Sequence, residues 1–206
     1  MCPAVCLIRP PECIEMTKPI ENLLTELGDE TKTLSLVRLY ELSGLDHDDI
    51  DIFSALWPRI PASRRRKIIS HLVDIAEANF EADFAAVFRA CFSDEDEFVR
   101  TQAIEGLWDV NDIKLIRPLV AFLRDDPSVT VRAAAATSLG RFVLLGELEK
   151  ITSTLNHIVC EALWEIINSS EEDIEVRRRA IESMAYSGDE AMVGVIADAY
   201  AHDDQR

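Results

Sequence analysis

Glycine and proline are scarce in this chain, which has 7 glycines and 8 prolines among its 206 residues. This scarcity excludes a turn-rich β-sandwich and a low-complexity linker, because both need many such residues. Basic residues are also in deficit: 21 lysines and arginines stand against 38 aspartates and glutamates, a formal net charge of −17. Nucleic acids and anionic membranes are bound through basic side chains. We therefore expect neither as a partner.

Long hydrophobic runs are absent as well. No uninterrupted apolar stretch approaches the roughly 20 residues that span a bilayer. The short apolar stretch at residues 4–8 follows no basic segment, so it does not have the pattern of a signal peptide. Apolar residues nevertheless make up 48% of the chain, which is enough to bury a core. We expect a folded cytoplasmic protein.

The cysteines have the spacing of neither a disulfide framework nor a metal site. Their number, five, is odd, and Cys91 and Cys160 stand alone in apolar segments, where small core residues are expected. Cys2, Cys6 and Cys13 lie close together in sequence but lack the fourth ligand that a structural zinc site needs. We expect no metal and no cofactor.

Motifs that identify enzymes are also missing. The four histidines form no His-Glu pair, no H-x3-H pair and no H-E-x-x-H motif. The scattered glycines form no phosphate-binding loop, no G-x-G-x-x-G motif and no G-x-S-x-G motif. We therefore expect a protein that is not an enzyme.

An internal repeat is the strongest signal that the sequence does contain. Three segments begin with Val-Arg, at Val99, Val131 and Val176, and place apolar residues four, five, eight and nine positions after the valine. This spacing forms one stripe along an α-helix. The residue four positions after the valine is always alanine, whose small side chain lets a neighbouring helix approach closely. The pattern predicts similar helices that stack on one another.

An acidic turn precedes each copy and supplies residues that cap helices well. One acid lies six residues before each repeat arginine. In a stack of units, these acids and arginines can pair within or between units and form a ladder of charge-assisted hydrogen bonds. The predicted structural ladder consists of Asp94, Arg100, Asp126, Arg132, Glu171 and Arg177.

Second helices are expected between the copies. In the one with apolar residues from Ile113 to Leu123, Pro118 should cause a kink or delay the regular start. We divide the chain into a disordered tail, an N-terminal helical cap and a repeat array, which span residues 1–15, 16–60 and 61–206. The other expected helices are 155–167 and 189–200, a more degenerate pair at 64–78 and 80–92, and shorter capping helices at 23–27, 33–42 and 50–57.

The motif D-x-x-V-x-V-R-x-x-A-A-x-x-L-G, which runs from Asp126 to Gly140, resembles a HEAT repeat. More specifically, it resembles the HEAT-like repeats of the phycobilin-lyase type. With its two neighbouring copies, the resemblance covers about residues 60–206. It implies an all-α protein, an α-solenoid of stacked antiparallel helix pairs, and says little about activity, because one fold serves many functions.

Two irregularities interrupt the repeat. The spacing from Val99 to Val131 is 32 residues, but from Val131 to Val176 it is 45. We expect the extra residues at 141–157, as a longer helix and an extended connection, where they form either a binding element or a tolerated surface elaboration. The end of the chain, residues 202–206, is acidic like the turns that precede the other copies. We therefore expect an array that is cut short or whose end is covered by a partner or a second copy. At the other end, Met16 is a plausible start.

These features predict a scaffold that binds another protein along the concave face of the solenoid, which the second helices would form. The acidity favours a partner with a basic segment, and a small-molecule ligand is not expected. The resemblance leaves open an alternative, a subunit of a phycobilin-lyase-like enzyme or a chaperone for a bilin or its client. Nucleic-acid binding is a third and disfavoured reading. The candidate partner-binding residues are Trp108, Trp164, Arg117 and Arg124, although packing between helices is the first expectation for the tryptophans.

Overall fold

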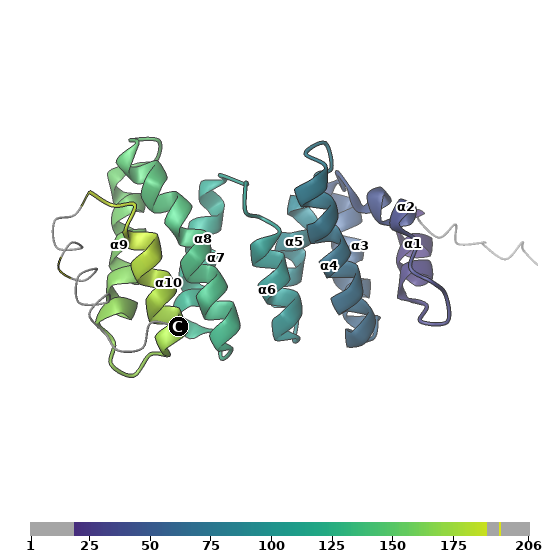
Figure 1. Cartoon of the computed structure of the whole chain (residues 1–206). Helices are drawn as coiled ribbons and strands as arrows, with labels where there is room; N and C mark the ends of the chain where they lie inside the picture. The colour runs from purple at the N-terminus through teal and green to yellow at the C-terminus, as the bar shows by residue number, and fades with distance from the viewer. Residues whose placement is uncertain (1–18, 189–193, 195–206) are drawn as a thin grey trace, which may run out of the picture.

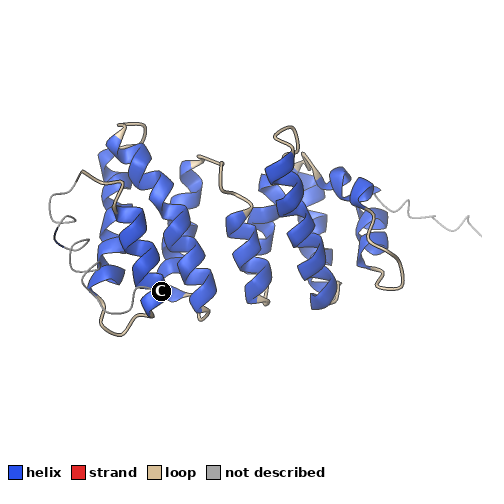
Figure 2. Cartoon of the chain, in the orientation of Figure 1, coloured by secondary structure: helices blue, strands red, loops and turns tan. Residues whose placement is uncertain are grey.

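The computed structural model describes residues 19–188 and residue 194. In this part of the chain every regular element is a helix, and no β-strand occurs. The helices stand side by side in a row (Figures 1 and 2) and form an α-solenoid, which confirms the predicted fold class. Several sequence predictions fall outside the described residues: the tail at 1–15 with Cys2, Cys6 and Cys13, the start at Met16, the helix at 189–200 and the acidic end at 202–206.

Ten α-helices and four short 3₁₀ helices make up the described chain. The α-helices are α1 Pro19–Gly28, α2 Leu36–Leu39, α3 His47–Leu56, α4 Ala62–Ala78, α5 Ala85–Ala90, α6 Glu97–Glu105, α7 Ile116–Asp125, α8 Val129–Glu147, α9 Ser153–Asn168 and α10 Ile174–Met184. The 3₁₀ helices are η1 Tyr40–Leu42, η2 Trp57–Arg59, η3 Cys91–Ser93 and η4 Ile113–Leu115.

The α-helices form two layers. The even-numbered helices α2, α4, α6, α8 and α10 pack in sequence against one another in the first layer, which contains the repeat motif. In the second layer, α1, α3 and α5 pack side by side, as do α7 and α9. Phe92, just after α5, bridges to Phe122 of α7, with ring centroids 5.1 Å apart. One hydrophobic core connects all these helices.

Successive helices alternate in direction, so the connections gather along two opposite edges of the solenoid (Figure 1). One edge is formed by the connections that follow the first-layer helices, and we call it the turn edge. It comprises residues 79–84, 106–112, 148–152 and 185–188. The opposite edge, which holds the connections before the first-layer helices, is called the ladder edge. It comprises residues 94–96, 126–128 and 169–173.

The repeat helices bury the stripe that defines the motif. The valine and the alanine four positions later have no exposed surface in any of the three copies. A fourth copy is present in α4, where Arg65 holds the arginine position and Ile68, Ile69 and Leu72 hold apolar positions of the stripe. Its pattern is less clear in the sequence because Arg64 replaces the valine. Arg64 is buried, and its Nε donates to the carbonyl oxygen of Leu27 at 2.6 Å, near the end of α1.

The insertion at 141–157 takes the expected form only in part: the helix is longer, as expected, but the connection that follows it is short. Helix α8 extends to Glu147, and the connection before α9 comprises residues 148–152. By length and composition alone α8 could cross a membrane, with a mean hydropathy of 1.2. Arg132 and Arg141 interrupt its apolar run, so the sequence contains no uninterrupted apolar stretch here. In the fold α8 packs against α6, α7, α9 and α10, as the core helix of a repeat array does.

Two second-layer helices show how local side chains set helix starts. Pro118 is the third residue of α7, and a 3₁₀ turn, η4, precedes that helix, so the expected delay of its regular start is confirmed. The helix expected at 80–92 instead begins at Ala85. The side chains of Asn79 and Asp83 accept hydrogen bonds from the backbone amides of Glu81 and Ala85, and such local bonds compete with the helix.

Candidate functional site

The repeat arginines join successive units along the ladder edge. The Arg100 guanidinium makes two hydrogen bonds to the Asp126 carboxylate of the next unit, Nε to Oδ2 at 2.8 Å and Nη2 to Oδ1 at 2.9 Å. Arg132 pairs in the same way with Glu172, with Nη2 2.7 Å from Oε1. Each arginine also donates back into its own unit, to the carbonyl oxygens of Asp94 and Asp126 respectively, at 2.7 and 2.9 Å. Carboxylate pairing is therefore between units, and within a unit the bond goes to the backbone.

The upstream rung, Arg65 with Asp94, is the most buried. Each side chain is 2% exposed, and Nε of Arg65 lies 3.0 Å from Oδ2 of Asp94. The indole Nε1 of Trp57 donates to the same oxygen at 2.6 Å, and the Asp96 amide donates to Oδ1 at 2.9 Å. Trp57 is thus a buried packing residue that also holds this rung. The apolar residues at the repeat spacing after Arg65 indicate this rung in the sequence. Arg64, which stands in place of the repeat valine, makes the pattern hard to recognise.

The last predicted pair requires a correction. Glu171 is exposed, and its neighbour Glu172 occupies the acid position opposite Arg132. The longer connection between these units shifts the register by one residue, which the six-residue spacing did not anticipate. Arg177 donates through Nε to the carbonyl oxygen of Ile167 at 3.3 Å. Within the described residues, no carboxylate forms an ion pair with it.

The four candidate partner-binding residues do not form one surface. Arg117, Arg124 and Trp164 lie on second-layer helices, and Arg124 already pairs with Glu165 of α9 at 2.7 Å. Trp164 is half-buried and packs against the core. Trp108 comes from the turn edge, after α6, and its side chain is 48% exposed.

Trp108 has an aromatic neighbour that the sequence analysis missed. Phe80, 77% exposed, lies on the preceding connection of the turn edge, and the two ring centroids are 6.4 Å apart at an interplanar angle of 61°. We call Phe80 and Trp108 the aromatic pair. The sequence pattern predicts a helix at 80–92, but Phe80 lies in the connection before α5. The aromatic pair is the one ring–ring contact among the described residues in which both rings are exposed.

The backbone beneath the aromatic pair is held in place. Nη1 of Arg141, from α8, donates to the carbonyl oxygens of Leu107 and Trp108 at 2.7 and 2.9 Å. Burial lowers the pKa of Arg141 to about 10, opposed by the negative charge of Asp109. On the other connection, the Asp83 amide donates to Oγ of Ser43 at 2.9 Å. Both turns are therefore tied to neighbouring elements.

Carboxylates surround the aromatic pair. Residues 74–85 and 101–112 together contain seven aspartates or glutamates and no lysine or arginine. Partial desolvation raises the pKa of the Glu105 carboxyl, against a hydrogen bond from Gln102, and the nearby negative charge of Glu77 raises it further. Asp112 is bound by Arg89 at 2.7 Å, so this carboxylate is already neutralised.

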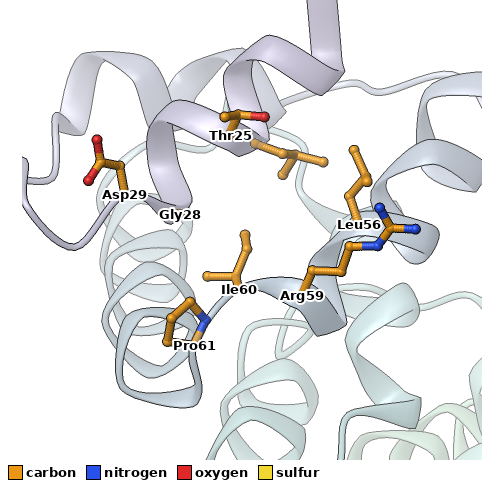
Figure 3. A pocket seen from close by; sticks show the side chains of 8 residues that line it. Thr25, Gly28, Asp29, Leu56, Arg59, Ile60 and Pro61 are labelled. Carbon is orange, nitrogen blue, oxygen red and sulfur yellow. The ribbon is translucent and has the colours of Figure 1, made fainter.

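Hollows in the surface are small and do not gather reactive groups. One of about 330 Å³ lies between the end of α1 and η2, with Asp29 and Arg59 on opposite sides of it (Figure 3). The Thr31 hydroxyl donates to Oδ1 of Asp29 at 2.6 Å, and the hydrogen bonds from Thr31 lower the pKa of Asp29. Over residues 19–188, no group of three or more His, Cys, Asp or Glu side chains is placed to hold a metal ion. Cys91 is buried, and burial raises the pKa of its thiol well above the ordinary value.

Comparison with known proteins agrees with this architecture. Residues 63–155 match the family model for HEAT repeats, which confirms this part of the predicted resemblance. A designed armadillo repeat protein, solved in complex with the peptide (KR)4, matches with a TM-score of 0.49 and 16% sequence identity. The match covers 89% of this chain and 89% of that chain. No curated protein sequence matches the chain. None of these findings bears on the phycobilin-lyase type.

Proposed function

We propose that this protein is a scaffold that binds another protein through its solenoid and does not itself catalyse a reaction. One observation carries the proposal: six of the eleven large apolar side chains that are exposed in the described chain lie along the turn edge. Clusters of exposed apolar residues mark interaction sites, whereas single ones are ordinary. The residues at this edge and at the adjoining helix ends are Phe80, Trp108, Ile113, Leu144, Leu148 and Tyr186.

The charge of the chain supports a basic partner. A net charge of −17 attracts a positively charged segment over a distance and speeds its encounter at low salt. Some of this charge is neutralised within the ladder, where Asp94, Asp126 and Glu172 bind arginines. The turn edge has no such ladder, so its carboxylates are the better candidates for contact with a partner.

The outer face of the second layer is the alternative surface, and it corresponds to the concave face favoured by the sequence. Arg117 is exposed there, but Arg124 and Glu165 neutralise each other. We favour the turn edge because its aromatic residues are exposed and its acids are in excess. We further propose a cytoplasmic location, in keeping with the odd number of cysteines and the isolated positions of Cys91 and Cys160 in the sequence.

The test is affinity capture by the full chain from its native cell, followed by reconstitution of the complex from two purified proteins. We expect one partner that binds the isolated chain directly, with an affinity that falls as salt rises. The proposal is overturned if no protein is retained above the control, or if the purified pair does not associate.

A further inference from the structure

We propose that the aromatic pair, Phe80 and Trp108, is the binding site for a lysine- or arginine-rich segment of the partner protein. This inference rests on the proposed function and names the chemistry of recognition. One cationic side chain lies over the exposed rings, and the surrounding carboxylates bind the neighbouring cations of the segment.

The geometry of the two rings suits a cation. The rings meet edge-on, at 61° and 6.4 Å, and both are exposed, Phe80 to 77% and Trp108 to 48%. An ammonium or guanidinium group within about 6 Å of a ring centroid is attracted by the negative face of the ring, most strongly by tryptophan. The same chemistry already occurs in this protein, where the Arg66 guanidinium lies 5.9 Å from the Phe98 ring centroid.

The negative charge around the rings favours a positively charged ligand. Glu77 and Glu81 flank Phe80 in sequence, and Glu105 and Asp109 flank Trp108. All four are exposed, and none of them is in an ion pair with a lysine or arginine of the described chain. An acidic peptide would be repelled here, and an uncharged apolar one would leave the carboxylates unpaired.

The spacing of the carboxylates favours an extended segment over a metal ion. In the described part of the chain, no three acidic, cysteine or histidine side chains converge as metal ligands. The carboxylates instead come from four separate positions, Glu77 and Glu105 near the ends of α4 and α6 and Glu81 and Asp109 in the connections that follow them. Several separate cations along a peptide can satisfy such a distribution, and a single ion cannot.

The site is also rigid before it binds. Arg141 holds the carbonyl oxygens of Leu107 and Trp108, and Ser43 binds the connection that bears Phe80. Gly106 has no room for a side chain, because a Cβ there would overlap the ring of Phe88. Ordering of loops and side chains on binding costs free energy, so prior order favours affinity.

The direct test is an NMR titration of the ¹⁵N-labelled full chain with a decapeptide of alternating arginine and serine. The three tryptophan indoles give three Nε1–H signals, which are assigned with the W57F, W108F and W164F variants. We expect the Trp108 signal to shift as peptide is added. The Trp57 signal should stay still, because that indole is buried and bonded to Asp94. Shifts confined to Trp164, or no shift and no binding at low salt, overturn the site.

Variants provide a second readout, measured as fluorescence anisotropy of the labelled peptide. We expect W108A and F80A each to weaken binding by about two- to fivefold, which is the range for an exposed cation–aromatic contact. The double variant E77Q/E105Q should weaken it further at low salt and make the affinity less sensitive to salt. The control is F98A, which removes an exposed aromatic residue at the opposite end of the same helix, α6, and should bind as the wild type does.

Failure of this site can be told apart from failure of the proposed function. If the captured partner binds W108A and F80A as tightly as the wild type, the aromatic pair is not the site, although the scaffold function stands. A peptide with glutamate in place of arginine that binds equally well also overturns the inference. If the wild-type chain has no partner at all, the scaffold function itself fails.

Discussion

Arg100 binds Asp126 of the next repeat through two parallel hydrogen bonds, of 2.8 and 2.9 Å, and the two side chains are only 11% and 5% exposed. The Asp126 carboxylate also accepts the backbone amide of Ser128 at 2.9 Å. One side chain therefore connects two repeats and shapes the turn that starts the second. Arg65 with Asp94 and Arg132 with Glu172 repeat this arrangement. The ladder is thus a feature of the fold.

Asp126→Ala should destabilise the protein strongly. It leaves the nearly buried Arg100 guanidinium without its carboxylate, and loss of one member of a buried pair costs about 3–5 kcal/mol. Because the pair retains slight exposure, we expect a fall of about 2–4 kcal/mol in the free energy of unfolding, measured by urea denaturation. Arg124→Ala, at the exposed pair with Glu165, is the matched control and should cost less than about 1 kcal/mol. Equal effects of the two substitutions would contradict the structural role of the ladder.

Trp57→Phe tests the most buried rung. Phenylalanine keeps most of the packing but removes the Nε1–H that donates to Asp94. Loss of one hydrogen bond to a buried charge should lower the free energy of unfolding by about 1–3 kcal/mol. Trp164→Phe, at a half-buried indole, is expected to change stability less. A smaller loss at Trp57 than at Trp164 contradicts this account of the Asp94 contacts.

Gly140→Ala should weaken the contact between α8 and α10. A Cβ on Gly140 would lie 2.8 Å from Oγ and 3.0 Å from Cβ of Ser183, which itself donates to the carbonyl oxygen of Ala136 at 2.9 Å. Overpacking of this kind costs about 1–3 kcal/mol. The double variant G140A/S183G removes the two nearest atoms and leaves the Cα of residue 183 at 3.2 Å, so it should recover part of the loss. No recovery would mean that the two helices do not approach as described.

The pH dependence of stability should have opposite signs at Asp112 and Glu105. The pKa of Asp112 is lowered from 3.8 by the hydrogen bond from the Lys114 amide and then by Arg89. Its stabilising contribution is therefore full above the unfolded pKa and lost as pH falls through the folded value. The pKa of Glu105 is raised, mainly by desolvation, so its ionisation disfavours the folded state as pH rises above 4.5.

Both effects are measured by the free energy of unfolding of D112N, E105Q and the wild type between pH 3 and pH 7. We expect D112N to be less stable than the wild type near neutral pH, with a difference that narrows in acid. E105Q should match the wild type at low pH and exceed its stability near neutral pH. If both substitutions raise, or both lower, the free energy of unfolding near neutral pH, these assignments are contradicted.

The protein should leave the visible absorbance spectrum of a bilin unchanged. The phycobilin-lyase-like alternative requires a pocket for a tetrapyrrole, whereas a protein-binding scaffold does not. We expect the visible spectrum of a bilin to be the same with and without the purified chain. A shifted or intensified absorbance band would instead favour the alternative over the scaffold.

Sequence periodicity predicted the helices well because burial of an apolar stripe depends only on local spacing. It predicted the ladder arginines for the same reason. It did not predict which acid each arginine binds, since Asp126 is 26 residues after Arg100 whereas Glu172 is 40 after Arg132. That distance depends on the length of the intervening helices and connections, which the motif does not encode.

The aromatic pair could not be predicted in the same way. Phe80 and Trp108 come from two different connections, and their contact depends on how α4 and α6 pack. The sequence pattern predicts a helix that begins at Phe80, whereas the side chains of Asn79 and Asp83 hold this residue in a turn. Exposure of Trp108 likewise follows from its position just beyond α6. A tertiary surface of this kind has no short sequence signature.

Site-specific photo-crosslinking in the native cell tests most directly whether the turn edge binds a protein. A photoreactive phenylalanine analogue is placed at Phe80, which is exposed on the turn edge, or at Phe98, which is exposed near the ladder edge. We predict that position 80 yields one prominent crosslinked partner, attached through a lysine- or arginine-rich segment, and that position 98 does not. Crosslinks from position 98 alone, or none from position 80 while the partner is present, would contradict the account.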